Sequence, residues 1–273
     1  MKLILTLFLF APLPLFSQPN GEFQKKEIDT LLAQSKQTQA LPLMKAYVSK
    51  PDTSTYYARV KIRIAFIYDQ VVDSVDQARK WFRAVMKDPY IDDKKQDFWL
   101  GGWEMFGNYK YVSCYSIGVS YYKEGNYDEA LRYYKLALDS FPYYSTSGSD
   151  INYHKTRVIN NIADLYSKKN DLTSAFAYLL PFFNDATIYS ERSRNKAARI
   201  IKEHNLKKAY LDLISKDFTS LIDNKTIVMK LEDKKIILDN FKQKKLKKEE
   251  IEALAKFYWQ AIRHIDIIEE LSK

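Results

Sequence analysis

The sequence predicts an all-α fold in which helical hairpins stack in series and a helical region closes the C-terminal end. Residues 114–142 contain the apolar spacing and the breaks of one helix–turn–helix unit. Small residues recur in the same frame at Ala130, Ala175 and Ala209, as expected where packed helices approach closely. The 273-residue chain has only 7 glycines and no strand-like alternation. We therefore expect one elongated solenoid with a continuous core.

The first 17 residues read as a secretory signal peptide. Lys2 precedes an apolar core over 3–10, two prolines break the segment, and Ser17 offers a small residue for cleavage. This core is shorter than the roughly 20 apolar residues that a membrane span needs. No cysteine lies near the cut, so we expect no lipid anchor and a periplasmic or secreted mature chain, as is typical of exported bacterial proteins. The alternative is a buried N-terminal helix.

Two helical hairpins are predicted before the best-defined unit. The first occupies 18–52, and Pro51-Asp52 ends it. The second begins at residue 53, and its last helix turns Ala78, Phe82 and Val85 inward. The four helices are expected over 22–36, 41–50, 55–72 and 76–85.

The unit at 114–142 carries a specific pattern of small, aromatic and helix-breaking residues. In chain order the matching residues are Ile117, Gly118, Tyr121, Ala130, Tyr134, Ala137 and Pro142. This stretch resembles the tetratricopeptide repeat (TPR), a helix–turn–helix unit of 34 residues. If Gly118 is position 8, only position 4 departs, because Cys114 stands in place of Trp. One unit cannot bury its own apolar face, so about three or more must stack.

Further copies follow in the same frame. The copy around Ala175 places Ile162 and Ala163 at the helix crossing. The copy around Ala209 is degenerate, because Lys216 takes an inward position. The predicted organisation is a signal peptide at 1–17, an N-terminal hairpin at 18–52, a TPR-like array at 53–216 with insertions at 90–110 and 143–155, and a helical cap at 217–273.

The last segment, 217–273, is expected to be helical throughout. One helix is predicted over 225–241, and the basic run 242–248 reads as a solvated helix end. The final helix has apolar residues at alternating spacings of three and four, namely Ile251, Leu254, Tyr258, Ala261, Ile265 and Ile268. We expect this seam to dock on the last repeat as a cap. The alternative is a zipper that joins a homodimer or a partner.

The resemblance to TPR proteins implies a candidate binding groove. First-helix positions 2, 5, 6, 9, 12 and 13 of a TPR line its concave face. Here they include Arg59, Arg63, Tyr115, Tyr122, Lys123, Arg157, Asn160, Asn161, Asp164, Lys168, Arg194, Asn195 and Lys202. Such a basic surface, with amide and tyrosine donors, can hold an acidic peptide or a terminal carboxylate. We expect an exported scaffold that binds a protein or peptide; the alternative is that these are ordinary solvated charges.

An aromatic insertion at 97–109 supports a second function. Trp99 and Trp103 could stack on sugars or clamp a peptide, so a glycan-binding protein is one alternative. A sensor or regulatory arm of a signalling system is another, since TPR arrays often precede such modules. No later segment is apolar enough to span a membrane, which weakens that second alternative.

The charge and the scarcity of reactive groups limit the chemistry. The net charge is +9, or +8 after removal of Lys2 (9 − 1), which favours anionic partners. Export argues against nucleic acid. The three histidines are far apart, and Cys114 is expected to be buried, so we predict no metal, no cofactor and no disulfide. No nucleophile–base set or phosphate loop is visible, and we predict no enzyme activity.

Overall fold

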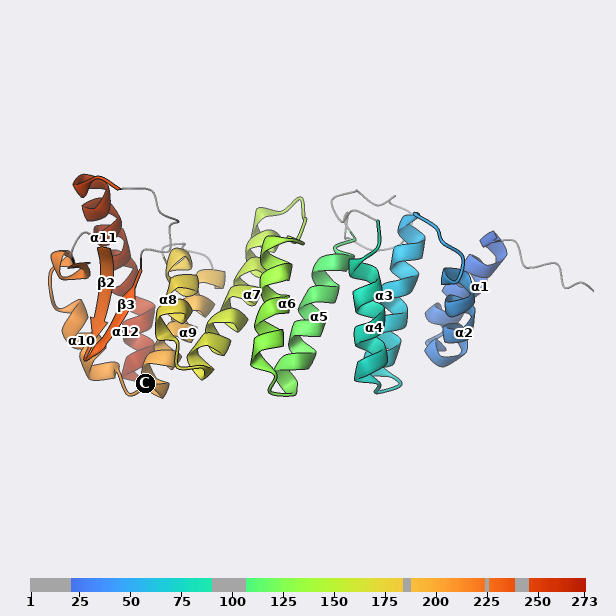
Figure 1. The fold of residues 1–273 in the computed structure, drawn as a ribbon, viewed down its shortest axis with the longest axis horizontal. Coiled ribbons are helices and arrows are strands. Elements are labelled where there is room, and N and C mark those ends of the chain that lie inside the picture. The colour runs from blue at the N-terminus through green and yellow to red at the C-terminus, as the bar shows by residue number, and fades with distance from the viewer. Residues whose placement is uncertain (1–20, 90–106, 184–187, 224–225, 239–245) are drawn as a thin grey trace, which may run out of the picture. The chain divides into compact units, whose positions relative to one another are not determined.

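The computed structural model describes residues 21–89, 107–183, 188–223, 226–238 and 246–273 (Figure 1). The chain divides into an N-terminal unit, Met1–Trp81, and a C-terminal unit, Phe82–Lys273. The boundary between them lies inside one helix. The predicted signal peptide and the predicted aromatic insertion with Trp99 and Trp103 lie outside the described residues.

The N-terminal unit is a set of antiparallel helices. Its elements are α1 (Gly21–Ala33), α2 (Gln37–Val48), α3 (Thr55–Gln70) and the start of α4 (Val75–Met86). Ile28, Met44 and Ile64 are fully buried in its core. Ser54 begins α3, because its side chain accepts a hydrogen bond from the backbone nitrogen of Tyr57 at 3.2 Å. The helices expected over 22–36 and 41–50 are present, to within a few residues at each end.

After α4, the next described elements of the C-terminal unit are α5 (Tyr109–Lys123) and α6 (Tyr127–Asp139), which form a hairpin. The two helices cross at Gly118, where an added Cβ would lie 2.7 Å from ring carbons of Tyr134. Gly125 reverses the chain with a φ of +76°, which glycine adopts at little cost. Ala130 is fully buried. The prediction that small residues mark this crossing is confirmed.

Two further helical pairs follow. They are α7 (Gly148–Lys168) with α8 (Leu172–Leu179), and α9 (Ile188–Glu203) with α10 (Lys207–Ile214); the short 3-10 helix η2 (Leu180–Phe182) extends α8. Ala163, Ala175 and Ala197 are fully buried, as their frame predicts. The prediction for Ala209 is wrong, because this residue is only partly buried and the next one, Tyr210, is fully buried instead. The second insertion was predicted too long, because residues 148–155 are helical and lengthen α7. Asp150 in the first turn of α7 suits the positive end of the helix dipole.

The helix predicted over 225–241 is wrong. After the 3-10 helix η3 (Phe218–Leu221) the chain forms three antiparallel strands in the order β1 (Ile222–Asp223), β2 (Thr226–Leu231) and β3 (Lys234–Ile237). Glu232 has a φ of +56° and, with Asp233, forms the tight turn between β2 and β3. Most of β2 is buried on both faces, so its sequence shows no alternation that would mark it as a strand.

Two helices close the chain where one was predicted. They are α11 (Lys248–Ile262) and α12 (Ile265–Ser272), and the side chain of His264 begins α12 by accepting a bond from the backbone nitrogen of Asp266. Ile251, Tyr258 and Ala261 are buried in the chain's own core, together with residues of α8, α9 and β2. The predicted seam is therefore largely covered from within the C-terminal unit. The prediction for Ile265 is wrong, because it is 62% exposed, and Ile267 and Leu271 are the buried residues of α12.

Candidate protein-binding face

The first helices of the three hairpins, α5, α7 and α9, lie side by side in the C-terminal unit (Figure 1). The amide of Asn161 on α7 donates to the hydroxyl of Tyr115 on α5 at 3.1 Å. The hydroxyl of Ser193 on α9 donates to the amide oxygen of Asn160 on α7 at 3.1 Å. We call this surface the first-helix face. It comprises Tyr115, Tyr122, Tyr153, Arg157, Asn160, Asn161, Asp164, Lys168, Arg192 and Lys196.

Asp164, the acidic residue predicted on this face, has its negative charge balanced by other residues of the chain. Tyr122 donates its hydroxyl to Oδ2 of Asp164 at 2.7 Å, and the ammonium of Lys196 donates to Oδ1 at 2.7 Å. Burial by itself would raise the pKa of Asp164, but these bonds outweigh it and lower the pKa of the carboxyl. The bonds tie α5, α7 and α9 together and leave little negative charge for a ligand to meet.

Two arginines on this face rest on tyrosine rings. The guanidinium carbon of Arg157 lies 4.2 Å from the ring centroid of Tyr115, on the preceding first helix. That of Arg192 lies 5.4 Å from the ring centroid of Tyr153, again on the preceding first helix. Both arginines are exposed. Stacking on a ring holds a guanidinium in place while its edges stay open to an acceptor.

Lysines end all three first helices. Lys123, Lys168 and Lys202 stand in the last turns of α5, α7 and α9 and are exposed. The ammonium of Lys168 lies 5.7 Å and 5.8 Å from the ring centroids of Tyr122 and Tyr127. Cations at helix C-termini also stabilise the helix dipole, so their presence there has a local structural reason as well.

The prediction that Arg194 lines the groove is wrong. Its side chain is only 4% exposed, donates to the carbonyl of Phe183 at 2.9 Å and to Oδ2 of Asp266 at 2.8 Å, and so ties α9 to α12. Because α12 packs against α9 beyond the last repeat, this position faces the protein interior. Asn195, the next predicted residue, is half-buried.

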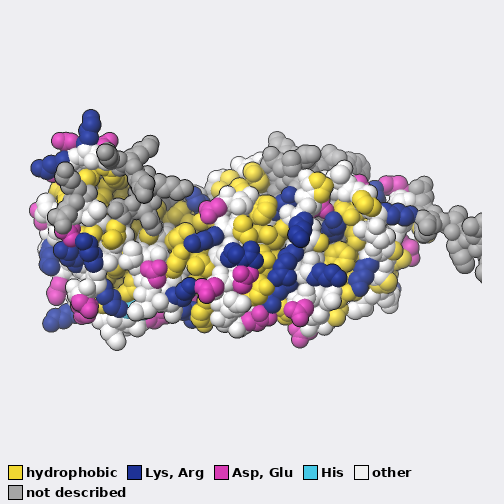
Figure 2. Space-filling model, in the orientation of Figure 1, with side chains coloured by type: hydrophobic (Ala, Val, Ile, Leu, Met, Phe, Trp, Pro, Cys, Tyr) yellow, Lys and Arg dark blue, Asp and Glu magenta, His cyan; other side chains and the backbone are white. Residues whose placement is uncertain are grey.

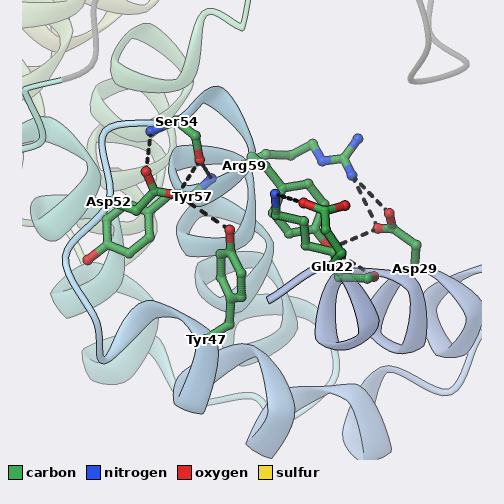
Figure 3. Close-up of polar contacts among 9 residues, drawn as sticks. Glu22, Asp29, Tyr47, Asp52, Ser54, Tyr57 and Arg59 are labelled. Carbon is green, nitrogen blue, oxygen red and sulfur yellow. Dashed lines mark hydrogen bonds and ion pairs between the residues drawn. The ribbon is translucent and has the colours of Figure 1, made fainter. Parts of the chain in front are cut away.

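The predicted residues Arg59 and Arg63 belong to the N-terminal unit. Arg59 donates to the carboxylate of Asp29 at 3.1 Å and lies over the ring of Tyr56 at 4.7 Å (Figure 3). Arg63 is exposed on α3. Nearby, Asp52 accepts a bond from the hydroxyl of Ser54 at 2.6 Å. The first-helix face is defined by the C-terminal unit alone.

An aromatic cluster at the start of α7 was missed by the sequence analysis. His154 stacks on Tyr143 with ring centroids 3.6 Å apart, and Tyr111 meets it edge-on at 5.4 Å. Tyr153 contacts Tyr189 of α9 at 5.6 Å. These residues were assigned to a loop, although Tyr153 and Arg157 already stand four residues apart, which places them on one side of a helix.

Within the described ranges, no three His, Cys, Asp or Glu side chains gather as a metal site would require. Cys114 is buried and its thiol is in no disulfide. None of the helices that the structure describes has the length and apolarity to cross a membrane. In the view of Figure 2, basic side chains are spread over the surface among acidic ones. Net charge therefore does not single out the first-helix face; its contacts do.

The geometry defines a helical-repeat protein whose first helices form a continuous side. Residues 111–144 match the family model of the tetratricopeptide repeat. The chain thus contains one tetratricopeptide repeat, and neighbouring helical pairs pack in a similar way.

Comparison with known proteins adds little detail beyond this. No curated protein matches the chain. Among solved structures it is similar to the TPR-like repeats of a kinesin light chain from Podospora anserina. That match has 13% identity and a TM-score of 0.44, and it covers 70% of this chain and 90% of that one.

Proposed function

We propose that this protein is a non-catalytic scaffold whose first-helix face binds a protein or peptide of net negative charge. TPR repeats generally mediate protein–protein interaction, and stacked repeats present extended surfaces for it. The observation that carries the proposal is the imbalance of charge on the face. Asp164 is neutralised by Lys196 and Tyr122, whereas Arg157 and Lys168 are exposed.

The donors on this face suit acidic acceptors. Arginine forks and amide groups hydrogen-bond carboxylates, and charge-assisted bonds of this kind are about twice as strong as neutral ones. Tyr115 and Tyr122 add rigid aromatic surface, which is common at binding sites for proteins. Lys196 is already paired with Asp164, so it need not contact the partner. A partner that carries acidic side chains can therefore bind the other donors without breaking that internal ion pair.

Site-specific crosslinking tests the proposal. A photoreactive residue replaces Lys168 on the first-helix face, and in a matched chain it replaces Arg132, an exposed residue of α6. We expect a discrete protein to be crosslinked from position 168 and not from 132, and to be lost when Arg157→Glu is added. Equal crosslinking from both positions, or crosslinks that survive Arg157→Glu, would contradict the proposal.

We further propose that the chain is exported. The support is the pattern of the first 17 residues: one positive charge, an apolar core, two prolines and Ser17. Mass spectrometry of the intact protein purified from its host would test this. A mature chain that starts at Gln18 is expected, whereas a chain that retains residues 1–17 would rule out cleavage.

A further inference from the structure

Arginine–tyrosine pairs recur in this protein, and two of them outside the first-helix face are completed by an internal carboxylate. Arg83, which lies 6.0 Å from the ring centroid of Tyr133, is instead bonded to the hydroxyls of Tyr121 and Tyr133. Arg59 lies over Tyr56 and donates to Asp29 at 3.1 Å. A second pair has the same form: Arg132 lies 4.1 Å from the ring centroid of Tyr133 and donates to Glu129 at 2.7 Å. In each case the ring covers one face of the guanidinium and a carboxylate occupies its edge.

The two pairs on the first-helix face differ in this respect. In the described part of the chain, no ion pair joins Arg157 or Arg192 to a carboxylate, although both are stacked on tyrosine rings. Among the described residues, Arg263, which follows α11, also lies over a ring, that of Trp259, without an ion pair to a carboxylate. Arg157 and Arg192 instead stand on the neighbouring first helices α7 and α9, and each lies over a ring and is exposed.

Their positions are fixed by the helices that carry them. Tyr153 and Arg157 stand four residues apart on α7, so they share one side of that helix. Arg192 reaches from α9 to Tyr153, and Arg157 reaches from α7 to Tyr115. Across the stacked first helices, the guanidinium of Arg192 is therefore displaced from that of Arg157 by about one helix-to-helix spacing, roughly 8–10 Å.

This spacing indicates what kind of ligand could satisfy both. A single carboxylate or phosphate is too small to bridge about 8–10 Å, so two separate anionic groups are needed. In an extended chain each residue advances about 3.3 Å, so side chains three residues apart lie about 10 Å from each other. They also lie on opposite faces of a flat strand, so the backbone must twist to present both.

We propose that Arg157 and Arg192 bind two Asp or Glu side chains of the partner, three residues apart in an extended segment. This inference rests on the proposed function, because it names the anchor points of a partner on the first-helix face. Each guanidinium would accept one carboxylate at its open edge, while Tyr115 and Tyr153 hold it in place. Asp164, which lies further along α7 on the same face, takes no part because its carboxylate is already bonded to Lys196 and Tyr122.

Fluorescence anisotropy with short labelled peptides, at about 50 mM salt, tests this inference. The probe is Ser-Glu-Ser-Ser-Glu-Ser; one control has adjacent glutamates (Ser-Ser-Glu-Glu-Ser-Ser) and another has glutamines in place of both. We expect the probe to bind about tenfold more tightly than the adjacent-glutamate peptide, and the glutamine peptide to bind weakest.

Full-length variants locate the binding. Arg157→Gln with Arg192→Gln should weaken probe binding about tenfold or more, and Arg157→Lys with Arg192→Lys should weaken it several-fold, because lysine keeps the charge but not the fork. The matched control, Lys207→Gln with Lys208→Gln, removes the same charge from the exposed start of the second helix α10 and should change binding less than twofold.

Each other outcome overturns the inference. Equal loss in the control pair would mean that binding follows net charge alone. Equal affinity for both glutamate peptides would refute the spacing, and no probe binding would refute carboxylate capture. In all three cases the proposed function still stands if position 168 crosslinks a partner and 132 does not. Loss of that crosslinking pattern is what would refute the proposed function.

Discussion

The crossing of α5 and α6 leaves no room for a methyl group at Gly118. Gly118 on α5 lies under the ring of Tyr134, and an added Cβ would sit 2.7 Å from two of its carbons. Tyr134 is 1% exposed and therefore has little room to move. We expect Gly118→Ala to lower the free energy of unfolding by about 1–3 kcal/mol, the usual cost of overpacking a core. Urea denaturation followed by circular dichroism would measure it.

Gly148 supplies the matched control for that substitution. It is the first residue of α7, and nothing lies within 4 Å of the Cβ it would gain. Gly148→Ala should leave stability within about 0.5 kcal/mol or raise it slightly, because alanine favours a helix. If both variants lose stability equally, the contact between Gly118 and Tyr134 is not what holds α5 and α6 at their distance.

We expect His154 to make the fold sensitive to acid. Burial lowers the pKa of its ring, and Nδ1 has no hydrogen-bond partner among the described residues. Asp150 raises the pKa and Arg157 lowers it, and burial outweighs both. The unfolded chain therefore binds a proton more readily than the folded chain. Stability should be full above the unfolded pKa of about 6.5 and should fall as the pH drops below it, until the folded pKa is passed.

Comparison with His154→Phe would reveal this effect. Phenylalanine can keep the stacking on Tyr143, which lies 3.6 Å away between ring centroids, but it does not titrate. Unfolding midpoints measured from pH 7.5 to 5 should decline more steeply for the native chain than for the variant. Parallel slopes for the two proteins would show that His154 is not the group responsible.

Between successive hairpins, a hydrogen bond from a cationic side chain to a tyrosine hydroxyl recurs, and we call this contact the clip. Arg83 on α4 donates to the hydroxyls of Tyr121 at 2.6 Å and Tyr133 at 3.0 Å. One repeat later, Lys135 on α6 donates to the hydroxyl of Tyr166 at 2.8 Å. In repeat numbering both cations stand at position 25 and reach position 11 of the following repeat. The clip stops there, since the next equivalents are the buried apolar residues Leu180 and Ile200.

The second clip can be measured by a double-mutant cycle. Lys135→Met removes the donor, and Tyr166→Phe removes the acceptor while it keeps the ring that stacks on Tyr178 at 5.8 Å. Each change should cost about 0.5–1.5 kcal/mol, and the double variant should cost less than their sum. Fully additive losses would mean that Lys135 and Tyr166 stabilise the hairpins independently.

At the same scale, the sequence was sufficient for the helical pairs and insufficient for the sheet. Gly118, Ala130, Ala163 and Ala175 mark the crossings of the first two pairs, because close approach needs small side chains whatever surrounds them. Ala209 does not mark the third, since it is only partly buried. Residues 226–231 lack such a local signal. Ile227, Val228 and Met229 are all buried, since the strand is covered on both faces, so neither period is visible in them.

For the whole molecule, the limits of prediction lie in contacts between distant segments. Arg157 was placed on the first-helix face by repeat numbering, and it is exposed there. Arg194 was placed by the same numbering, but it pairs with Asp266, 72 residues away. No repeat pattern announces that α12 lies against α9. Arg192 was not predicted on the face, because Tyr153, the residue whose ring it contacts, was assigned to a loop.

The final helix acts as the closing element of the C-terminal unit. α12 packs against α9 as α9 packs against α7, so it takes the place that the first helix of another repeat would occupy. Ile267 and Leu271 are fully buried, and Arg194 is only 4% exposed where it meets Asp266. Removing the carboxylate would leave a buried guanidinium without the Asp266 charge that balances it, which typically costs about 3–5 kcal/mol.

Hydrogen exchange should localise that cost. In Asp266→Ala, we expect the amides of α12 and of the facing part of α9 to exchange faster, while those of α1 to α3 keep their native rates as an internal control. The double variant Arg194→Met with Asp266→Ala should recover part of the protection, because the buried charge is gone. If α12 exchanges at its native rate in Asp266→Ala, its apolar residues alone hold it on α9, and the ion pair contributes little to closing the array.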